Sequence, residues 1–226
     1  MNIKITKVSL TIGRNLNRGA AKQVRSYLGN LFWDEQKIHN HKPDGSFIYC
    51  YPRVQYKIID GACLLIGFEE GVELVKRAFY DLGSLNLNGR WEEILSSQLE
   101  TYTASLSLVP EPIAYSFLTP WLALNEKNYT EYQQLDHPVS KKKFLERILT
   151  GNIISLSKSV GYTVPTAIAV NIERIRTVKT SLKAIPMLGF KGSFSANFEI
   201  PDHWGIGKSV SRGFGTLVQI NKTNDA

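Results

Sequence analysis

Two histidines in a short polar stretch are the residues of this sequence best suited to acid–base chemistry. His39 and His41 stand two positions apart. In extended backbone, side chains at this spacing point the same way and lie about 6.5–7 Å apart, so two imidazoles can flank one phosphodiester. Metal-free RNA cleavage needs a base to take the 2′-OH proton and an acid to protonate the leaving 5′-oxygen. Histidine suits both roles because its ordinary pKa, about 6.5, lies close to working pH.

Two alternatives compete with catalysis at these histidines. Imidazoles at this spacing can ligate zinc, but a structural zinc site takes four Cys or His ligands, and Cys50 is the only sulfur nearby. We therefore expect no metal and no cofactor. A His-x-His pair can also be a solvated turn, and residue type alone does not decide between that turn and a catalytic pair.

A glycine-rich segment near the end of the sequence is the second candidate site. Residues 205–215 hold two Gly-apolar-Gly triplets separated by five residues, two of them basic. Glycine lets a backbone approach a ligand closely, and clustered N–H groups beside cations bind anions. A dinucleotide-binding motif would require a helix after the second triplet, whereas residues 216–220 are typical of a strand. The residues of the predicted phosphate-binding loop are Gly205, Gly207, Lys208, Arg212, Gly213 and Gly215.

Three stretches in one order resemble the CRISPR-associated endoribonucleases that cut precursor CRISPR RNA within its repeats, the sixth Cas family. They are the two glycine triplets of 205–215, the stretch 51–72, and His39-Asn40-His41. The resemblance implies tandem ferredoxin-like domains and a general acid–base histidine after the first helix, with a Tyr or Lys often nearby. His39 and His41 match the His-x-His pair of a subset of the family.

The third catalytic group is left open by the sequence. Tyr49, Tyr51 and Lys57 all lie close enough along the chain. We favour Tyr49 as an orienting group and Lys57 as the cation that stabilises transition-state charge.

Composition points to an anionic partner. The chain has 226 residues, a formal net charge of +7 and two cysteines. The charge favours nucleic acid, and two cysteines are too few for a disulfide framework. The sequence has no membrane-span pattern and no signal-peptide pattern, so we expect a cytoplasmic protein without membrane contact.

Hydrophobic periodicity predicts an α+β fold made of tandem ferredoxin-like (RRM-like) domains. The first half reads βαββαβ, with a bulge expected in the first strand. Pro110 and Pro112 mark the expected boundary between a domain of residues 1–110, carrying the histidines, and a domain of residues 111–226, carrying the glycine loop. The first six elements are expected at 2–12, 16–31, 47–58, 62–68, 72–82 and 101–109.

The second half is predicted to be a less regular copy of the same unit. Strands are expected at 114–124, 166–180, 187–200 and 216–221, with a helix from about Ser140. Three lysines then fall in the first turn behind a Ser140 cap, where the helix dipole disfavours cations. An external anion such as an RNA backbone would compensate, although a solvated face is an equal alternative. The basic RNA-binding candidates of this half are Lys141, Lys142, Lys143, Arg174 and Arg176.

Tryptophans offer surfaces for base stacking. Trp204 adjoins the glycine loop and is the best candidate, whereas Trp33, Trp91 and Trp121 are expected in the core.

Together these observations predict a metal-independent endoribonuclease that cuts precursor CRISPR RNA within its repeats, leaving 5′-OH and 2′,3′-cyclic phosphate ends. The expected partners are CRISPR repeat RNA, other Cas proteins of an interference complex, and a second copy of the chain. The alternative is a non-catalytic CRISPR-RNA-binding subunit of the same fold.

Overall fold

The computed structural model describes residues 1–32 and 51–220. The chain divides into two compact domains. The N-terminal domain comprises Asn2–Ala104 together with Val210–Gly213, and the C-terminal domain comprises Met1, Ser105–Ser209 and the residues from Phe214 onward. The division falls at residues 104 and 105, a few residues before the position that the prolines suggested.

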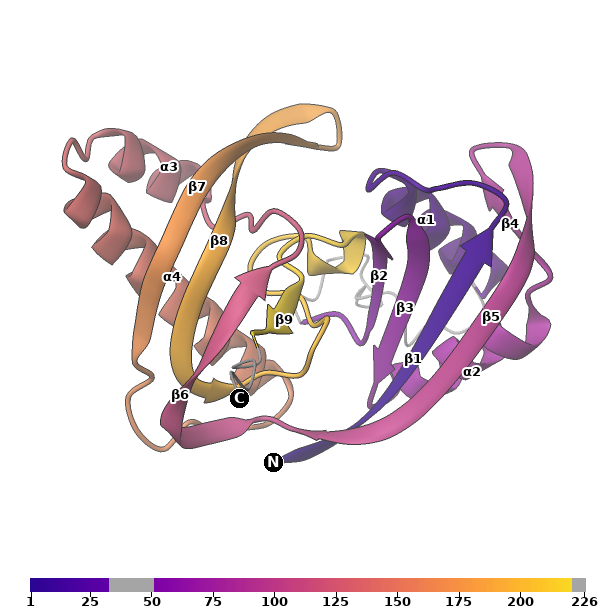
Figure 1. Cartoon of the computed structure of the whole chain (residues 1–226), viewed down its shortest axis with the longest axis horizontal. Helices are drawn as coiled ribbons and strands as arrows, with labels where there is room; N and C mark the ends of the chain where they lie inside the picture. Colours follow the sequence, from indigo (N-terminus) through magenta and orange to yellow (C-terminus); the bar gives the residue numbers. More distant parts are fainter. Residues whose placement is uncertain (33–50, 221–226) are drawn as a thin grey trace, which may run out of the picture. The chain divides into compact units, whose positions relative to one another are not determined.

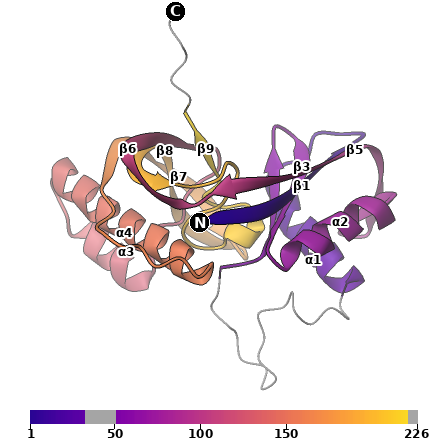
Figure 2. The same cartoon turned by 90° about the horizontal axis from the view of Figure 1, so that it is seen from below.

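The N-terminal domain has the strand order of a ferredoxin-like fold. Its antiparallel sheet has the order β2-β3-β1-β5-β4, and α1 and α2 lie on one face of this sheet (Figures 1 and 2). The elements are β1 (Asn2–Ile12), α1 (Ala20–Leu31), β2 (Val54–Ile59), β3 (Ala62–Phe68), α2 (Gly71–Asp81), β4 (Ser84–Leu87) and β5 (Arg90–Ser105). The βαββ part and the second helix thus follow the predicted order.

Alternation along the strands decides which side chains face the helices. Val8, Tyr56 and Leu65 lie opposite one another across β1, β2 and β3 and join the core beneath α1 and α2. The bulge expected in β1 is absent from its pairing with β3, because the register runs without a break from Ile5 to Leu10. Residues of both parities are buried in this strand, which explains why the sequence suggested a change of face.

The β4–β5 hairpin was not predicted. Asn88 and Gly89 both have positive φ, 58° and 86°, as the two central residues of a type I′ turn require. The sequence carries this Asn-Gly signal, but β4 has only four residues, and β5 is mostly exposed and does not alternate clearly.

The C-terminal domain repeats most of the strand order. Its four strands, in the order β7-β8-β6-β9, correspond to β2-β3-β1-β5 of the first domain, and the edge strand β4 has no counterpart in this sheet. Helices α3 and α4 follow β6, but the second connection, residues 200–216, is a loop rather than a helix. The elements are β6 (Ser107–Phe117), α3 (Glu126–Gln133), α4 (Pro138–Ser159), β7 (Val170–Leu182), β8 (Ile185–Glu199) and β9 (Leu217–Gln219). The tandem ferredoxin-like prediction is therefore confirmed.

Pro110 and Pro112 lie inside β6 rather than at the boundary. The pairing of β6 with β8 shifts register between Leu108 and Ile113. Proline cannot donate a ladder hydrogen bond, so an irregularity of this kind is where a strand tolerates it.

An aromatic cluster fills the core of the C-terminal domain. Phe117 stacks on Trp121 at 5.4 Å, and Phe194 packs against both Phe117 and Tyr115. The Trp121 indole donates to Asn152 Oδ1 at 3.0 Å, which ties α4 to this cluster. Among the described residues, no helix is both long and apolar enough to cross a membrane.

Candidate nucleic-acid interface

Three of the four predicted catalytic residues lie outside the described part of the chain. His39, His41 and Tyr49 fall in residues 33–50. Lys57, the fourth, lies in β2 and can be examined directly.

Lys57 is a fully buried lysine. Its Nζ donates to Gln55 Oε1 at 2.9 Å, and Gln55 is fully buried as well. Burial lowers the Lys57 pKa to about 7 because the charged ammonium loses its hydration. Strongly shifted pKa values occur both at functional sites and in structural cores, so Lys57 stays a predicted site residue.

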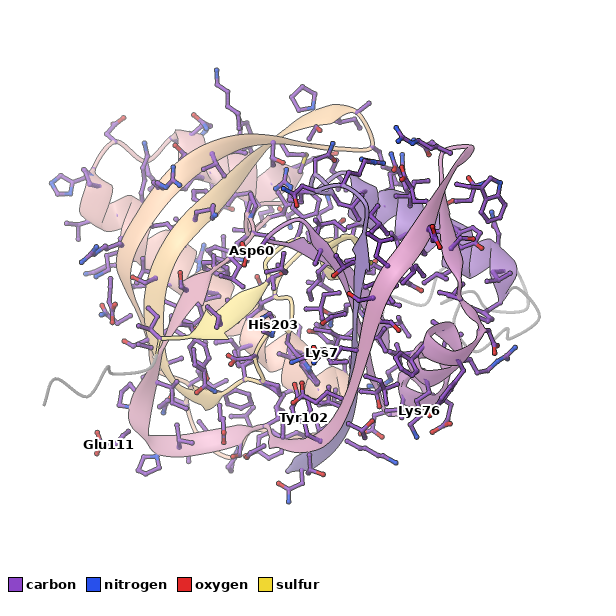
Figure 3. All side chains as sticks on the ribbon, turned by 45° about the vertical axis from the view of Figure 1, so that its right-hand side comes forward. Lys7, Asp60, Lys76, Tyr102, Glu111 and His203 are labelled. Atoms are coloured by element: carbon purple, nitrogen blue, oxygen red, sulfur yellow. The ribbon has the colours of Figure 1, made fainter. Side chains whose placement is uncertain are left out.

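Lys57 and Gln55 belong to the sheet face opposite α1 and α2. Lys57 lies across from Leu64, and Gln55 lies across from Ile66, which in turn pairs with Lys7 of β1. Lys7 on this face binds Glu100 at 2.6 Å, and its Nζ lies 6.0 Å from the centre of the Tyr102 ring. Figure 3 labels Lys7 and Tyr102, which approach each other there. The Lys7 charge is thus already compensated within the domain.

The 3-10 turn η2 (Val210–Arg212) brings the middle of the glycine-rich segment into the N-terminal domain. It packs against α1 and against β2, the edge strand of the sheet. A Cβ on Gly213 would lie 3.0 Å from the Tyr56 carbonyl oxygen and 3.5 Å from the Ala21 Cβ. Glycine is needed here for close approach to β2.

This contact brings two arginines together. Burial lowers the Arg212 pKa, and the nearby positive charge of Arg25 on α1 lowers it further. The Arg212 Nε is buried without a hydrogen-bond partner, and neither arginine forms an ion pair with a described residue. Two guanidinium groups held near each other without a carboxylate form a site that an anion would stabilise. The sequence predicted a role for Arg212 in the glycine-rich segment but gave no sign that it lies near Arg25.

The rest of the glycine-rich segment is held by backbone hydrogen bonds inside the C-terminal domain. The N–H groups of Ile206, Lys208 and Gly215 donate to the carbonyls of Gly215, Leu122 and Pro120. Within the part that belongs to the N-terminal domain, the N–H of Gly213 donates to the Val210 carbonyl. These four N–H groups are therefore not available to an anion, which corrects the expectation of an open backbone cradle at those positions.

The glycines of the segment serve close packing. Gly207 has φ +86°, and a Cβ there would lie 2.6 Å from the Trp121 Nε1. Gly215 has φ +62°, and its Cβ would lie 2.0 Å from the Ile206 carbonyl oxygen. Gly205 forms an isolated bridge with Thr216. The fold thus requires these residues, while the Lys208 side chain is exposed and remains a candidate phosphate contact.

The segment does not start a nucleotide-binding helix. After Gly213 the chain continues through residues 214–216 into β9. This overturns the dinucleotide alternative and confirms the expected strand.

The basic run on α4 has partners inside the protein. The helix begins at Pro138, and its cap is His137, whose Nδ1 accepts from the Val139 N–H at 3.2 Å. The prediction of a Ser140 cap is therefore wrong. The three lysines begin in the second turn of α4, where the helix dipole disfavours cations less. Lys141 lies 5.4 Å from the Tyr132 ring, and Lys142 donates to Asn171 at 3.0 Å.

Lys142 also lies 3.6 Å from Glu146, so an external anion is not needed to compensate it. Lys143 is exposed and pairs with no described acidic residue. It is the member of the run best placed to meet a ligand.

Arg174 and Arg176 share one face of β7, as predicted. They lie across from Ser193 and Lys191 of β8, beyond a bulge at Glu173. The neighbouring β8 residues Phe190 and Phe194 have the opposite parity and are buried in the aromatic core. The two arginines and Lys191 therefore form a basic strip on the sheet face turned away from that core. Polar residues alternate with Phe along β8, and this signal could have identified Lys191 from sequence.

The tryptophan expectations are corrected at two positions. Trp204 is fully buried and offers no stacking surface, whereas Trp91, expected in the core, is 63% exposed. Trp121 is buried as expected, and Trp33 lies outside the described residues.

In residues 1–32 and 51–220, no group of three His, Cys, Asp or Glu side chains could hold a metal ion. Cys63 is a free thiol buried in the core, and burial raises its pKa to about 12.

The protein is of the tandem ferredoxin-like class, and its second domain has a glycine-rich loop in place of the second helix. The chain belongs to the Cas6b family, because the Cas6b N-terminal domain matches residues 1–105 and the Cas6b C-terminal domain matches residues 107–220.

Individual relatives agree with this assignment. The chain resembles a crystal structure of Cas6b with 35% identity and a TM-score of 0.90, covering 97% of this chain and 100% of that one. A crystal structure of the CRISPR RNA processing endoribonuclease Cas6b matches with 31% identity, a TM-score of 0.78 and the same coverage. The uncharacterized protein MJ0978 of Methanocaldococcus jannaschii is 37% identical over 142 residues, 63% of this chain and 96% of that protein.

Proposed function

We propose that the protein is a metal-independent endoribonuclease that cuts precursor CRISPR RNA within its repeats and releases guide RNA. The observation that carries this proposal is the match of both domains to Cas6b, together with the resemblance to a solved Cas6b named as a CRISPR RNA processing endoribonuclease.

His39 and His41 divide the proton transfers. One imidazole takes the proton from a ribose 2′-OH, whose oxygen then attacks the adjacent phosphorus. The bond from phosphorus to the 5′-oxygen breaks, and the other imidazole protonates that oxygen. The products are a 2′,3′-cyclic phosphate and a 5′-OH end, and no metal takes part.

Lys57 supplies positive charge to this reaction. Its pKa near 7 means that neither protonation state dominates in the free protein at neutral pH. A phosphate close to Nζ favours the charged form, so substrate binding itself charges the lysine. The ammonium then stabilises the non-bridging oxygens as their charge grows. Tyr49 orients a histidine.

The RNA backbone is held by cations around the glycine-rich segment and on the C-terminal sheet. Arg212 with Arg25 offers a phosphate site in the N-terminal domain, supported by their proximity and their lack of described acidic partners. In the C-terminal domain, Lys208, Arg174 and Arg176 contribute further phosphate contacts. The cut RNA then passes to other Cas proteins of an interference complex.

A cleavage assay in EDTA tests the proposal. Purified protein is incubated with a repeat-containing transcript, and the ends of the products are mapped. One cut per repeat with 5′-OH and 2′,3′-cyclic phosphate ends is the expected result. RNA that stays intact but is bound with slow release would instead identify a non-catalytic binding subunit, and cleavage that stops in EDTA would identify a metal-dependent nuclease.

A further inference from the structure

A polar pocket lies on the N-terminal domain, between α1 and the β4–β5 hairpin. Its volume is about 290 Å³, at the small end of ligand pockets, which span about 300–1,000 Å³. A single flat ring fits such a site better than a folded peptide does. The residues that decide its chemistry are Gln23, Tyr27, Asn30, Asn86, Asn88 and Trp91.

Trp91 gives the pocket an aromatic wall. The side chain is 63% exposed, and Tyr27 packs against it edge-on at 6.0 Å with an interplanar angle of 86°. Large aromatic side chains are normally buried or matched to a partner, so an exposed indole beside a pocket indicates a surface for stacking.

Amides form the rest of the lining. Asn86 lies directly opposite Trp91 in the hairpin, so their side chains leave it on the same face. Asn30 and Gln23 approach from α1. The amides of Gln23 and Asn30 each carry both donors and acceptors, which is the pattern that reads the edge of a base. An apolar partner helix would require an apolar lining, and this pocket lacks one.

The charge around the pocket suits a nucleotide. None of its lining residues is acidic or basic. Lys22 on α1, one turn before the lining residue Ser26, is exposed and forms no ion pair with a described residue. It can meet the phosphate of a base held in the pocket.

We propose that this pocket binds one unpaired nucleobase of the substrate RNA, stacked on Trp91 and read by the amides of Gln23 and Asn30. The proposal rests on the proposed function, since it names a second contact for the same RNA. Because Asn and Gln pair with the N6 and N7 atoms of adenine in two hydrogen bonds, adenine is the preferred base.

The test uses the full chain and two kinds of short single-stranded RNA. One carries 2-aminopurine, which lacks the N6 amino group of adenine and so reports stacking alone. The other carries a single adenine or a single uracil in an otherwise identical strand, and the ratio of the two affinities reports the base preference. Stacking on Trp91 quenches the fluorophore. Trp91→Ala should abolish the quenching and weaken binding about 5- to 100-fold, whereas Trp91→Phe retains most of both. Gln23→Ala with Asn30→Ala should remove the preference for adenine. Asn86 is left intact because its Oδ1 accepts from the Gly89 N–H at 2.7 Å and holds the turn.

Tyr80→Ala is the matched control, because Tyr80 is 74% exposed on α2 and does not line the pocket. Wild-type quenching and affinity in Trp91→Ala would overturn the proposal, and so would a changed oligomeric state, which would make the surface a protein contact. If the wild-type protein fails to cut repeat RNA but the Trp91-dependent quenching remains, the proposed function fails and the pocket stands. If cutting is intact and the quenching does not depend on Trp91, only the pocket fails.

Discussion

The two domains share a strand order but complete it in different ways. In the N-terminal domain the second connection is α2, whose Val72, Val75 and Ala78 are buried in the core. In the C-terminal domain the same connection is the glycine-rich segment, which is held by backbone hydrogen bonds to residues 120 and 122.

This difference decides which of the two connections is free to present side chains to a ligand. A helix that packs its apolar face on a sheet is committed to that sheet, whereas a glycine-rich connection can fold tightly without a core of its own. It therefore delivers Arg212 to α1 and β2 and leaves Lys208 exposed. Under the proposed function, the N-terminal domain carries the chemistry and the segment that replaces the helix chiefly positions the RNA.

Removing the imidazoles should give the largest effect. We expect His39→Ala with His41→Ala to slow cleavage at least about a hundredfold, since general acid–base catalysis contributes about 10²–10⁴. RNA affinity should be largely retained, because the cations that hold the backbone are untouched. Single-turnover rates and filter binding measure the two quantities separately.

His137→Ala is the control for this variant. His137 caps α4 through its Nδ1, so its loss should lower stability by about 1 kcal/mol and leave the cleavage rate unchanged. Cleavage at the native rate by the double histidine variant would remove the chemistry from this part of the chain.

Lys57 allows a test without RNA. Its pKa is about 7 in the folded protein and near 10.5 in the unfolded chain. Between these values the unfolded chain holds one more proton, so the free energy of unfolding rises with pH, by up to about 1.4 kcal/mol per unit. Below pH 7 both states are protonated and the contribution is constant. Lys57→Met should abolish this rise, by about 2 kcal/mol between pH 7.5 and 9.5, as measured by urea unfolding.

Lys4→Met serves as the control, because Lys4 is an exposed lysine of the same sheet. The pH dependence should be the same in Lys4→Met and the wild type. An unchanged slope in Lys57→Met would mean that Lys57 is not the group that titrates.

The sequence could predict what depends on local pattern. Alternation and helical spacing placed β2, β3 and both N-terminal helices, and the spacing of Arg174 and Arg176 placed them on one face. What it missed depends on tertiary contacts. The burial of Trp204 and the meeting of Arg25 with Arg212 follow from how the glycine-rich segment packs, and no periodicity records that packing.

The expected role of the glycines differs from the one that the structure gives them. Four glycines beside cations indicated a backbone cradle, but Gly207 and Gly215 are glycines because a Cβ would collide with Trp121 and with Ile206. The same residue type serves ligand approach and tight packing, so sequence alone does not separate the two.

Adding a methyl group to the glycine-rich segment should test its structural role. Gly215→Ala forces a Cβ against the Ile206 carbonyl at a positive φ, which should cost about 1–3 kcal/mol of stability. Gly151→Ala in α4 meets nothing within 4 Å and should stabilise the protein by up to about 1 kcal/mol. Thermal unfolding compares the two. Equal changes in stability for the two variants would show that the glycine-rich segment has room for a side chain at residue 215.

The two arginines give the smallest expected effect and the sharpest test of how the domains divide the work. Arg212 belongs to the glycine-rich segment and Arg25 belongs to α1. Both lie in the N-terminal domain, close enough for the Arg25 charge to lower the Arg212 pKa. If both contact phosphates, Arg25→Gln with Arg212→Gln should reduce the slope of log affinity against log salt by about 1.4, at about 0.7 per contact with single-stranded RNA. Arg77→Gln is the control, since Arg77 lies 3.8 Å from Asp81 and is already compensated. An unchanged slope with intact cleavage would mean that RNA does not pass this pair. A changed slope with an unchanged single-turnover rate at saturating RNA would show that the pair holds the substrate and leaves the chemistry to other residues of the same domain.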